Sequence, residues 1–100
     1  MRVKFVDEAA AEFLNAISYY EQEQPKLGRR FKEEVQQTLL WLAENAEACR
    51  LRASGYRRLN LRIFPYYLPY IIRGSTLWVI AVAHHRREPE YWIKREKKVP

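Results

Sequence analysis

Hydrophobic residues recur at the spacing of an α-helix in two stretches of the first half of the chain. The apolar positions of the first stretch are Ala9, Phe13, Ala16, Ile17 and Tyr20. Residues at this spacing share one side of a helix. We predict that this helix ends before Pro25, because proline disfavours a helical conformation at the preceding residue. Asp7 is expected to be its N-cap, and Glu8 suits the positive end of the helix dipole.

A second helix is predicted from about Leu27 to Asn45 by the same periodicity. Its apolar stripe consists of Leu27, Phe31, Val35, Thr38, Leu39 and Leu42. Trp41 lies on the flank of this stripe, and Leu40 points away from it. Because only a short segment around Pro25 separates the two helices, we predict an antiparallel helical hairpin whose apolar faces cover a sheet.

The alternation of apolar and polar residues predicts strands at Arg2–Val6 and Tyr56–Ile63. The buried face of the second of these strands would hold Arg57, Leu59, Leu61 and Ile63, and its basic face would hold Tyr56, Arg58, Asn60 and Arg62. Arg57 is the exception on the apolar face, where its guanidinium is expected to reach past the strand end. Pro65 then marks a bend.

Two further strands are predicted at Tyr66–Arg73 and Thr76–Ala83, joined by a two-residue turn at Gly74-Ser75. Pro69 inside the first of them favours an edge position or a bulge. The second is apolar on both faces, which is typical of a central strand covered on both sides. The predicted fold class is therefore α+β, in the order β-α-α-β-β-β. A helical hairpin packs on one face of a small, mostly antiparallel sheet, and the other face is partly open.

Composition adds limits to this picture. One hundred residues with 48% hydrophobic and 14% aromatic content predict a single globular domain over residues 1–100. No apolar run is long enough to cross a membrane, and acidic residues interrupt the N-terminal stretch where a signal peptide would be apolar. The single cysteine, Cys49, fits a reducing compartment, so we expect a cytoplasmic protein.

The net charge of +6 is unevenly distributed along the chain. Nine acidic residues stand against four basic ones from Asp7 to Glu47, whereas twelve basic residues stand against three acidic ones from Arg50 to Pro100. The second half is therefore expected to bind polyanions, either a phosphate backbone or an acidic protein segment. The alternative is that the charge serves solubility alone.

Candidate chemistry gathers after the last apolar strand. His85 and Tyr91 can move protons, and arginines such as Arg58, Arg62 and Arg87 can hold a phosphate, which together would suffice for RNA cleavage without a metal. No metal site or cofactor is expected. The chain has no cysteine pair and no glycine-rich phosphate loop, and the adjacent histidines would point to opposite faces of a strand.

Each of these residues also has a structural interpretation. His84 can be a polar cap at the strand end, and Arg86 and Arg87 can pair with nearby acidic side chains. Tyr91 and Trp92 can anchor the C-terminal segment in the core. The basic C-terminal end is expected to be a solvated tail.

Several segments together resemble the RelE/ParE superfamily of bacterial toxins from type II toxin–antitoxin modules. The matching pieces are Tyr19-Tyr20-Glu21, Leu27-Gly28-Arg29-Arg30-Phe31, Gly55-Tyr56-Arg57-Arg58, the FPY turn Phe64-Pro65-Tyr66, Val79 to His84, Arg86-Arg87, Pro89 and Tyr91-Trp92. The resemblance implies the same β-α-α-β-β-β fold and a growth-inhibiting toxin. It also implies an antitoxin encoded beside it, whose acidic, partly disordered segment folds across the toxin. The exposed Leu40 and Trp41 suit that partner.

The resemblance leaves two targets open. ParE-like members bind DNA gyrase, and RelE-like members cleave mRNA on the ribosome. In a nuclease, His85, Arg87 and Tyr91 would be catalytic. Contacts to the RNA or another target are expected from Arg58, Arg62, Arg86, Lys94 and Arg95. The lysine pair typical of nuclease members is absent, and the FPY turn and the Tyr91-Trp92 ending are closer to ParE-like members, so gyrase binding is the first expectation and mRNA cleavage the second.

Overall fold

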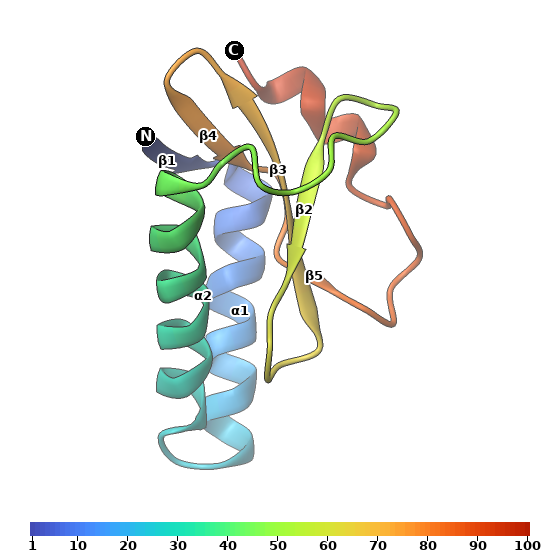
Figure 1. The fold of residues 1–100 in the computed structure, drawn as a ribbon. Helices are drawn as coiled ribbons and strands as arrows, with labels where there is room; N and C mark the ends of the chain where they lie inside the picture. The colour runs from blue at the N-terminus through green and yellow to red at the C-terminus, as the bar shows by residue number, and fades with distance from the viewer.

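Two helices lie against one side of a five-stranded sheet in the computed structural model, which describes residues 1–100 (Figure 1). In chain order the elements are β1 (Arg2–Phe5), α1 (Asp7–Glu23), α2 (Leu27–Glu44), β2 (Arg57–Asn60), β3 (Tyr66–Arg73), β4 (Thr76–Val79), β5 (Ala83–His84) and the 3₁₀ helix η1 (Ile93–Lys98). The strand order is β1-β4-β3-β2, and β5 pairs with β3. Only the β1–β4 pair is parallel. The predicted α+β architecture is confirmed.

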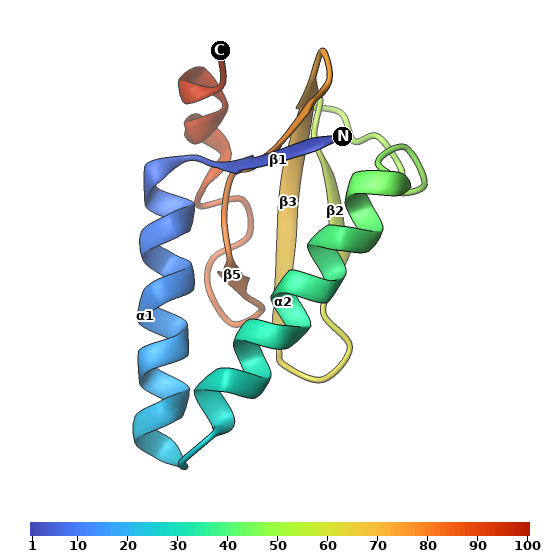
Figure 2. The same cartoon turned by 90° about the vertical axis from the view of Figure 1, so that its left-hand side faces the viewer.

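The helical hairpin forms as predicted, with α1 ending before Pro25 and α2 beginning at Leu27. The two helices meet at their connecting turn and diverge away from it (Figure 2). The buried side chains of α2 all come from the predicted stripe and are Phe31, Val35, Leu39 and Leu42. Leu40 and Trp41, which fall outside that stripe, remain 70% and 47% exposed. The helical period alone was therefore sufficient to orient α2.

The N-cap of α1 is Val6, so the prediction of Asp7 at this position was wrong. The Val6 N–H donates to the Val79 carbonyl at 3.1 Å, and the Val6 carbonyl accepts the Ala10 N–H at 3.0 Å. One residue thus ends the first strand's pairing and begins the helix, and its side chain is only 4% exposed. Asp7 and Glu8 occupy the first turn, where the helix dipole favours a negative charge.

The strand predicted over Tyr56–Ile63 is shorter in the structure, where β2 covers Arg57–Asn60. The Glu34 carboxylate on α2 accepts the N–H groups of Arg62, Ile63 and Phe64 at 2.8, 3.0 and 3.2 Å. These N–H groups cannot also serve a strand ladder, so the chain bends before Tyr66. Ile63 is consequently 71% exposed, which contradicts its predicted place on the buried face.

The first residue of that predicted strand also lies differently from expectation. Tyr56 lies outside β2 and is only 4% exposed, because it packs edge-on against Trp92 at 4.7 Å. It keeps the predicted side of the sheet, the side of Tyr67 and Arg58, but the C-terminal segment covers it there. Arg57 behaves as expected, because its guanidinium reaches past the strand and donates to the Cys49 carbonyl at 2.6 Å.

Pro69 lies in the interior of the sheet and not at an edge, because β3 has β2 on one side and β4 on the other. The expected bulge is present. Tyr70 pairs with Val79 and Tyr67 pairs with Ala83, so three residue steps along β3 match four along the opposing chain. The single strand predicted over Thr76–Ala83 is therefore two strands, β4 and β5, separated by residues 80–82.

The C-terminal segment is folded, which corrects the expectation of a solvated tail. It runs along the side of the sheet away from α2 and ends in η1 (Figure 1). Trp92 is completely buried, as its interpretation as a core anchor predicted, and Val99 is 8% exposed. The indole Nε1 of Trp92 donates to the Tyr67 hydroxyl at 2.9 Å. The apolar side chains among these basic residues give the segment enough buried surface to pack.

Candidate functional site

One candidate site lies on the face of the sheet away from the helices and is formed by Arg58, Tyr67 and His85, which we call the open-face cluster. The Arg58 guanidinium lies 3.7 Å from the centre of the Tyr67 ring. The His85 ring lies 5.2 Å from the same ring at an angle of 38°. The Trp92 indole donates a hydrogen bond to the Tyr67 hydroxyl. The Tyr67 ring is therefore held in one position, and it in turn fixes Arg58 and His85. The cluster brings together one cation and one imidazole from β2 and from the end of β5.

The environment of His85 favours its neutral form. Burial, the Arg58 charge and the nearby His84 lower the pKa of the His85 imidazole below its ordinary value of 6.5. At neutral pH this imidazole can accept a proton, while the adjacent guanidinium can hold an anion. The open-face cluster therefore has the components of a base beside a phosphate contact.

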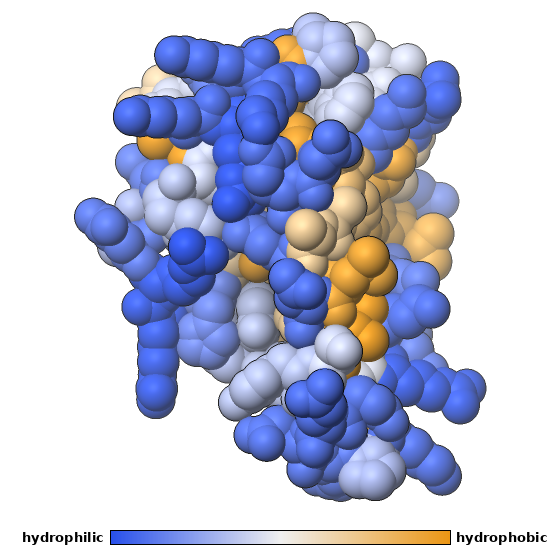
Figure 3. Space-filling view, turned by 180° about the vertical axis from the view of Figure 1, so that it is seen from behind, coloured by the Kyte–Doolittle hydropathy of each residue, from blue (hydrophilic) through white to orange (hydrophobic).

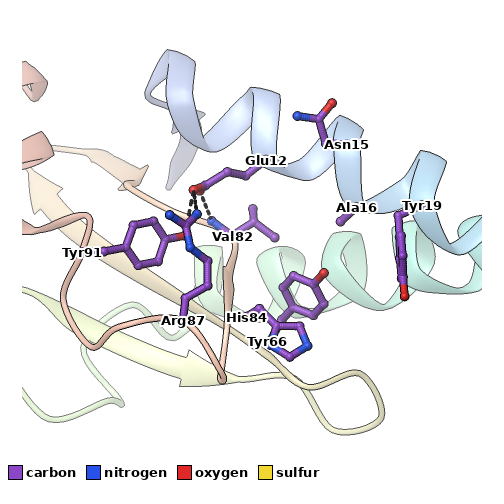
Figure 4. A pocket seen from close by; sticks show the side chains of 9 residues that line it. All are labelled: Glu12, Asn15, Ala16, Tyr19, Tyr66, Val82, His84, Arg87 and Tyr91. Carbon is purple, nitrogen blue, oxygen red and sulfur yellow. Dashed lines mark hydrogen bonds and ion pairs between the residues drawn. The ribbon is translucent and has the colours of Figure 1, made fainter.

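A second candidate site, which we call the edge pocket, lies between α1 and the chain from Val82 to Tyr91, which follows the break between β4 and β5 (Figure 4). Its volume is about 280 Å³. The pocket is lined by Glu12, Asn15, Ala16, Tyr19, Tyr66, Val82, His84, Arg87 and Tyr91. Its polar centre is the carboxylate of Glu12, whose side chain is only 17% exposed.

The Glu12 carboxylate has hydrogen-bond donors on both oxygens. Oε1 accepts the Val82 N–H at 3.0 Å, and Oε2 accepts the Tyr91 hydroxyl at 2.7 Å. Arg95 donates to both oxygens at 2.9 and 3.0 Å, and Arg87 lies 3.5 Å away. Bidentate pairing of this kind is strong and directional. The carboxylate therefore joins α1 to the loop and to the C-terminal segment.

Tyr91 is engaged inside this pocket, where its hydroxyl donates a hydrogen bond to Glu12. The Arg87 guanidinium lies 3.7 Å from the centre of the Tyr91 ring. Burial and the hydrogen bond to Glu12 raise the pKa of the Tyr91 hydroxyl above its ordinary value. The hydroxyl consequently remains protonated at neutral pH and acts as a donor to Glu12.

The structure divides the predicted catalytic residues between the two sites. His85 belongs to the open-face cluster with Arg58, whereas Arg87 and Tyr91 belong to the edge pocket. The edge pocket contains His84, whose ring packs edge-on against Tyr66 at 5.0 Å. The two histidines thus lie on opposite faces of the sheet, as predicted from their adjacency.

The predicted target-contacting residues are also spread over several environments. Arg86 and Lys94 are exposed and make no ion pair. Arg62 lies next to α2, and its backbone N–H donates to Glu34. Arg95 is bound to Glu12 and to the Ile80 carbonyl, so its guanidinium serves the fold.

Glu12 and Tyr67 were not identified from the sequence. Glu12 carries a detectable signal, since it falls between Ala9 and Ala16 on the apolar stripe of α1, where a carboxylate requires a partner. The sequence holds no comparable signal for Tyr67, whose importance depends on the strands beside it.

A groove lies between α2 and the chain after β2, and we call it the α2 groove. Its volume is about 820 Å³. It is lined by Arg30, Glu33, Glu34, Gln37, Thr38, Trp41, Leu59, Asn60, Arg62 and Ile63. Glu34 is already bonded to the backbone and Glu33 pairs with Arg29. Arg30 and Arg62 therefore provide the unpaired charge beside the apolar Trp41 and Ile63. The groove therefore suits an amphipathic partner with acidic residues.

The opposite side of the hairpin also exposes apolar surface. Hydrophilic side chains cover most of the face shown in Figure 3, and an apolar area lies over α1. On that helix Leu14 is 65% exposed.

None of the helices combines the length and the hydrophobicity needed to cross a membrane.

Comparison with known proteins places these features in a family. Residues 3–89 match the model of the ParE toxin of the type II toxin–antitoxin system parDE. No curated protein matches the chain. The fold is similar to a structure of the chromosomal ParDE toxin–antitoxin system from P. aeruginosa, with a TM-score of 0.73 at 20% identity over 84% of this chain and 95% of the other.

Two E. coli structures share the same fold. The intact RelBE toxin–antitoxin complex gives a TM-score of 0.65 at 24% identity over 86% of this chain and 98% of the matched chain. The isolated RelE toxin gives 0.64 at 23% identity over 99% of this chain and 98% of the other. The predicted RelE/ParE-like fold is thereby confirmed.

Proposed function

The chain belongs to the family of ParE toxins of type II toxin–antitoxin systems, and from this premise we propose that it inhibits growth by binding DNA gyrase. The exposed basic residues of the loop and the C-terminal segment, above all Arg86 and Lys94, would make the contact. A target in the cytoplasm agrees with the expectation drawn from the single cysteine.

The observation that supports binding over catalysis is the separation of the candidate proton-transfer groups. His85 stacks on Tyr67 at the open face, whereas the Tyr91 hydroxyl donates to Glu12 in the edge pocket. General acid–base catalysis requires both groups within hydrogen-bonding reach of one substrate. An inhibitor that acts by binding alone needs an exposed contact surface and no pair of proton-transfer groups.

A second candidate function, ribosome-dependent mRNA cleavage, is supported by the open-face cluster. The neutral His85 beside Arg58 pairs a potential base with a phosphate contact. In this alternative His85→Ala abolishes mRNA cleavage, and the DNA supercoiling activity of gyrase is unaffected by the protein.

The two functions are distinguished by measuring gyrase supercoiling and the cleavage of translated mRNA with the same purified chain. We expect dose-dependent inhibition of supercoiling and intact mRNA. Arg86→Ala combined with Lys94→Ala should weaken inhibition about tenfold through lost charge contacts. Arg29→Ala is the matched control, because Arg29 is 77% exposed on α2 and pairs only with Glu33. Full supercoiling activity together with mRNA cleavage would exclude the gyrase proposal.

We further propose that the antitoxin, encoded by the neighbouring gene, covers the α2 groove with an acidic, amphipathic segment. Trp41 would be an anchor, with Leu40 on the adjoining surface of α2. Trp41→Ala should weaken antitoxin binding about thirtyfold, because buried aromatic anchors dominate interface energies. Gln36→Ala, on an exposed position of the same helix, should leave it unchanged. Equal affinities of the two variants would place the antitoxin elsewhere.

A further inference from the structure

Glu12 connects four separate parts of the chain through one carboxylate. It accepts hydrogen bonds from Val82 between β4 and β5, from Tyr91 at the end of the following loop and from Arg95 in η1. We propose that Glu12 is a positioning residue that fixes the loop of residues 85–91 and the C-terminal segment for contact with the target. The activity part of this inference rests on the proposed function, and the structural part does not.

The contact of Arg95 with the sheet explains why the C-terminal segment is part of this arrangement. Pro69 on β3 opposes Ile80, and the Pro69 carbonyl accepts the Ile80 N–H at 3.0 Å. Proline has no N–H to donate in return, so the Ile80 carbonyl lacks its partner from β3. Arg95 Nη1 donates to that carbonyl at 3.1 Å and to Glu12 at 2.9 Å. The C-terminal segment therefore supplies a hydrogen bond that the strand cannot.

The loop is held on its other flank as well. Glu90 adopts a left-handed conformation with φ 58, and its carboxylate accepts the Tyr56 hydroxyl at 2.6 Å. At the start of the loop the His85 N–H donates to the Pro65 carbonyl at 2.9 Å. The exposed residues 86–89 thus lie between anchored positions. A loop that is ordered before it meets its target loses less conformational entropy on binding.

Glu12→Gln tests the role of the carboxylate with a minimal change in shape. Every group bonded to Glu12 is a donor, so the amide NH₂ of glutamine would face another donor. Arg95 and Arg87 would also lose their counter-charge. Glu8→Gln is the matched control, because Glu8 lies one turn earlier on α1 and pairs with Lys98 of the same C-terminal segment.

Amide hydrogen exchange of the isolated chain reads out the structural part. In Glu12→Gln the amides of residues 82–95 should exchange at least about tenfold faster, while those of α2 and β1 keep their wild-type rates. Glu8→Gln should leave residues 82–95 unchanged. Wild-type exchange throughout Glu12→Gln, or equal acceleration in α2, would overturn the assignment, because the residue would then be dispensable or important only for overall stability.

Measurements of gyrase inhibition and of antitoxin binding test the functional part of the proposal. Glu12→Gln should inhibit supercoiling about tenfold less well than Glu8→Gln, because displacement of contact residues costs activity, and both variants should bind the antitoxin equally. Full inhibition by a variant whose loop exchanges faster would overturn the positioning role. If the wild-type chain does not inhibit gyrase, the proposed function fails, and hydrogen exchange still decides whether Glu12 positions the loop.

Discussion

Two guanidinium–tyrosine pairs determine how individual side chains are presented at the candidate sites. Arg58 lies over Tyr67 and Arg87 lies over Tyr91, each 3.7 Å from the ring centre. Such contacts contribute on the order of 0.5–1 kcal/mol at exposed sites and more where water is excluded. Each arginine is therefore held in one position while part of its guanidinium remains available to an anion.

At the residue scale, the Arg58 charge should be measurable in the titration of His85. Arg58→Ala removes one of the causes that lower the His85 pKa, so this pKa should rise toward 6.5, although burial continues to oppose it. Because the folded state binds this proton less tightly than the unfolded chain, acidification below pH 6.5 works against folding in the wild type, and less so in the variant. NMR titration of the imidazole measures the change, with Arg29→Ala as control. An unchanged titration would mean that burial and His84 set the His85 pKa without a contribution from Arg58.

The helical hairpin depends on a close approach at the start of α2. The Glu21 carboxylate accepts the Lys26 N–H at 3.0 Å and the Gly28 N–H at 3.1 Å. These are N–H groups at the α2 N-terminus that the helix itself leaves unpaired. A carboxylate from α1 thus performs the capping of α2, where no side-chain cap is present at Lys26.

At the element scale, Gly28→Ala should loosen the hairpin. A Cβ at this position would overlap the Ile17 carbonyl oxygen and come within 2.9 Å of the Glu21 Cβ. Separation of the helices to relieve this overlap should cost about 2 kcal/mol of unfolding free energy, a typical value for overpacking. Urea denaturation measures the loss, and Gln36→Ala on the exposed side of α2 should stay within about 0.5 kcal/mol of the wild type. Equal stabilities would show that the helices separate without cost.

On the scale of the whole molecule, the C-terminal segment joins the two sides of the protein. Trp92 fills the core beside Tyr56 and Tyr67, while Arg95 binds Glu12 on α1. The basic half of the chain is thereby packed against the acidic half. The exposed basic residues of the loop therefore lie next to the packed core.

Removal of the buried indole should therefore affect the whole fold. Trp92→Ala should lower the free energy of unfolding by about 3–5 kcal/mol, because it leaves a cavity and an unpaired Tyr67 hydroxyl. Trp41→Ala is the matched control, since Trp41 is 47% exposed and its loss should cost less than about 1 kcal/mol. Thermal and urea unfolding compare the two. A small effect at Trp92 would show that the segment is peripheral.

The charge distribution predicts a salt-dependent interaction with the antitoxin. Basic residues of the α2 groove and the basic second half of the chain would attract an acidic segment over long range, so raising the salt from low to physiological concentrations should lower the affinity about tenfold. Calorimetric titration at several salt concentrations measures this dependence. An affinity independent of salt would indicate a purely apolar interface.

The sequence by itself determined the helices, most strands and the order of the elements. Helical periodicity placed the buried face of α2 correctly, and the Gly74-Ser75 turn marked the end of β3. These features depend on neighbours along the chain, and a local pattern records them. The basic charge of the second half of the chain followed equally from composition.

Only the tertiary structure decided how distant segments complete one another. The bend at Ile63 depends on Glu34, and the break between β4 and β5 depends on Pro69. The candidate catalytic residues lie close together in sequence but on different sides of the sheet. Tyr67 packs against His85 on one side, and Glu12 binds Arg87 and Tyr91 on the other. Hydrogen bonds and packing between residues far apart in the chain produce no periodic pattern in the sequence. Local patterns could therefore identify these residues as candidates but could not identify the residues that they contact.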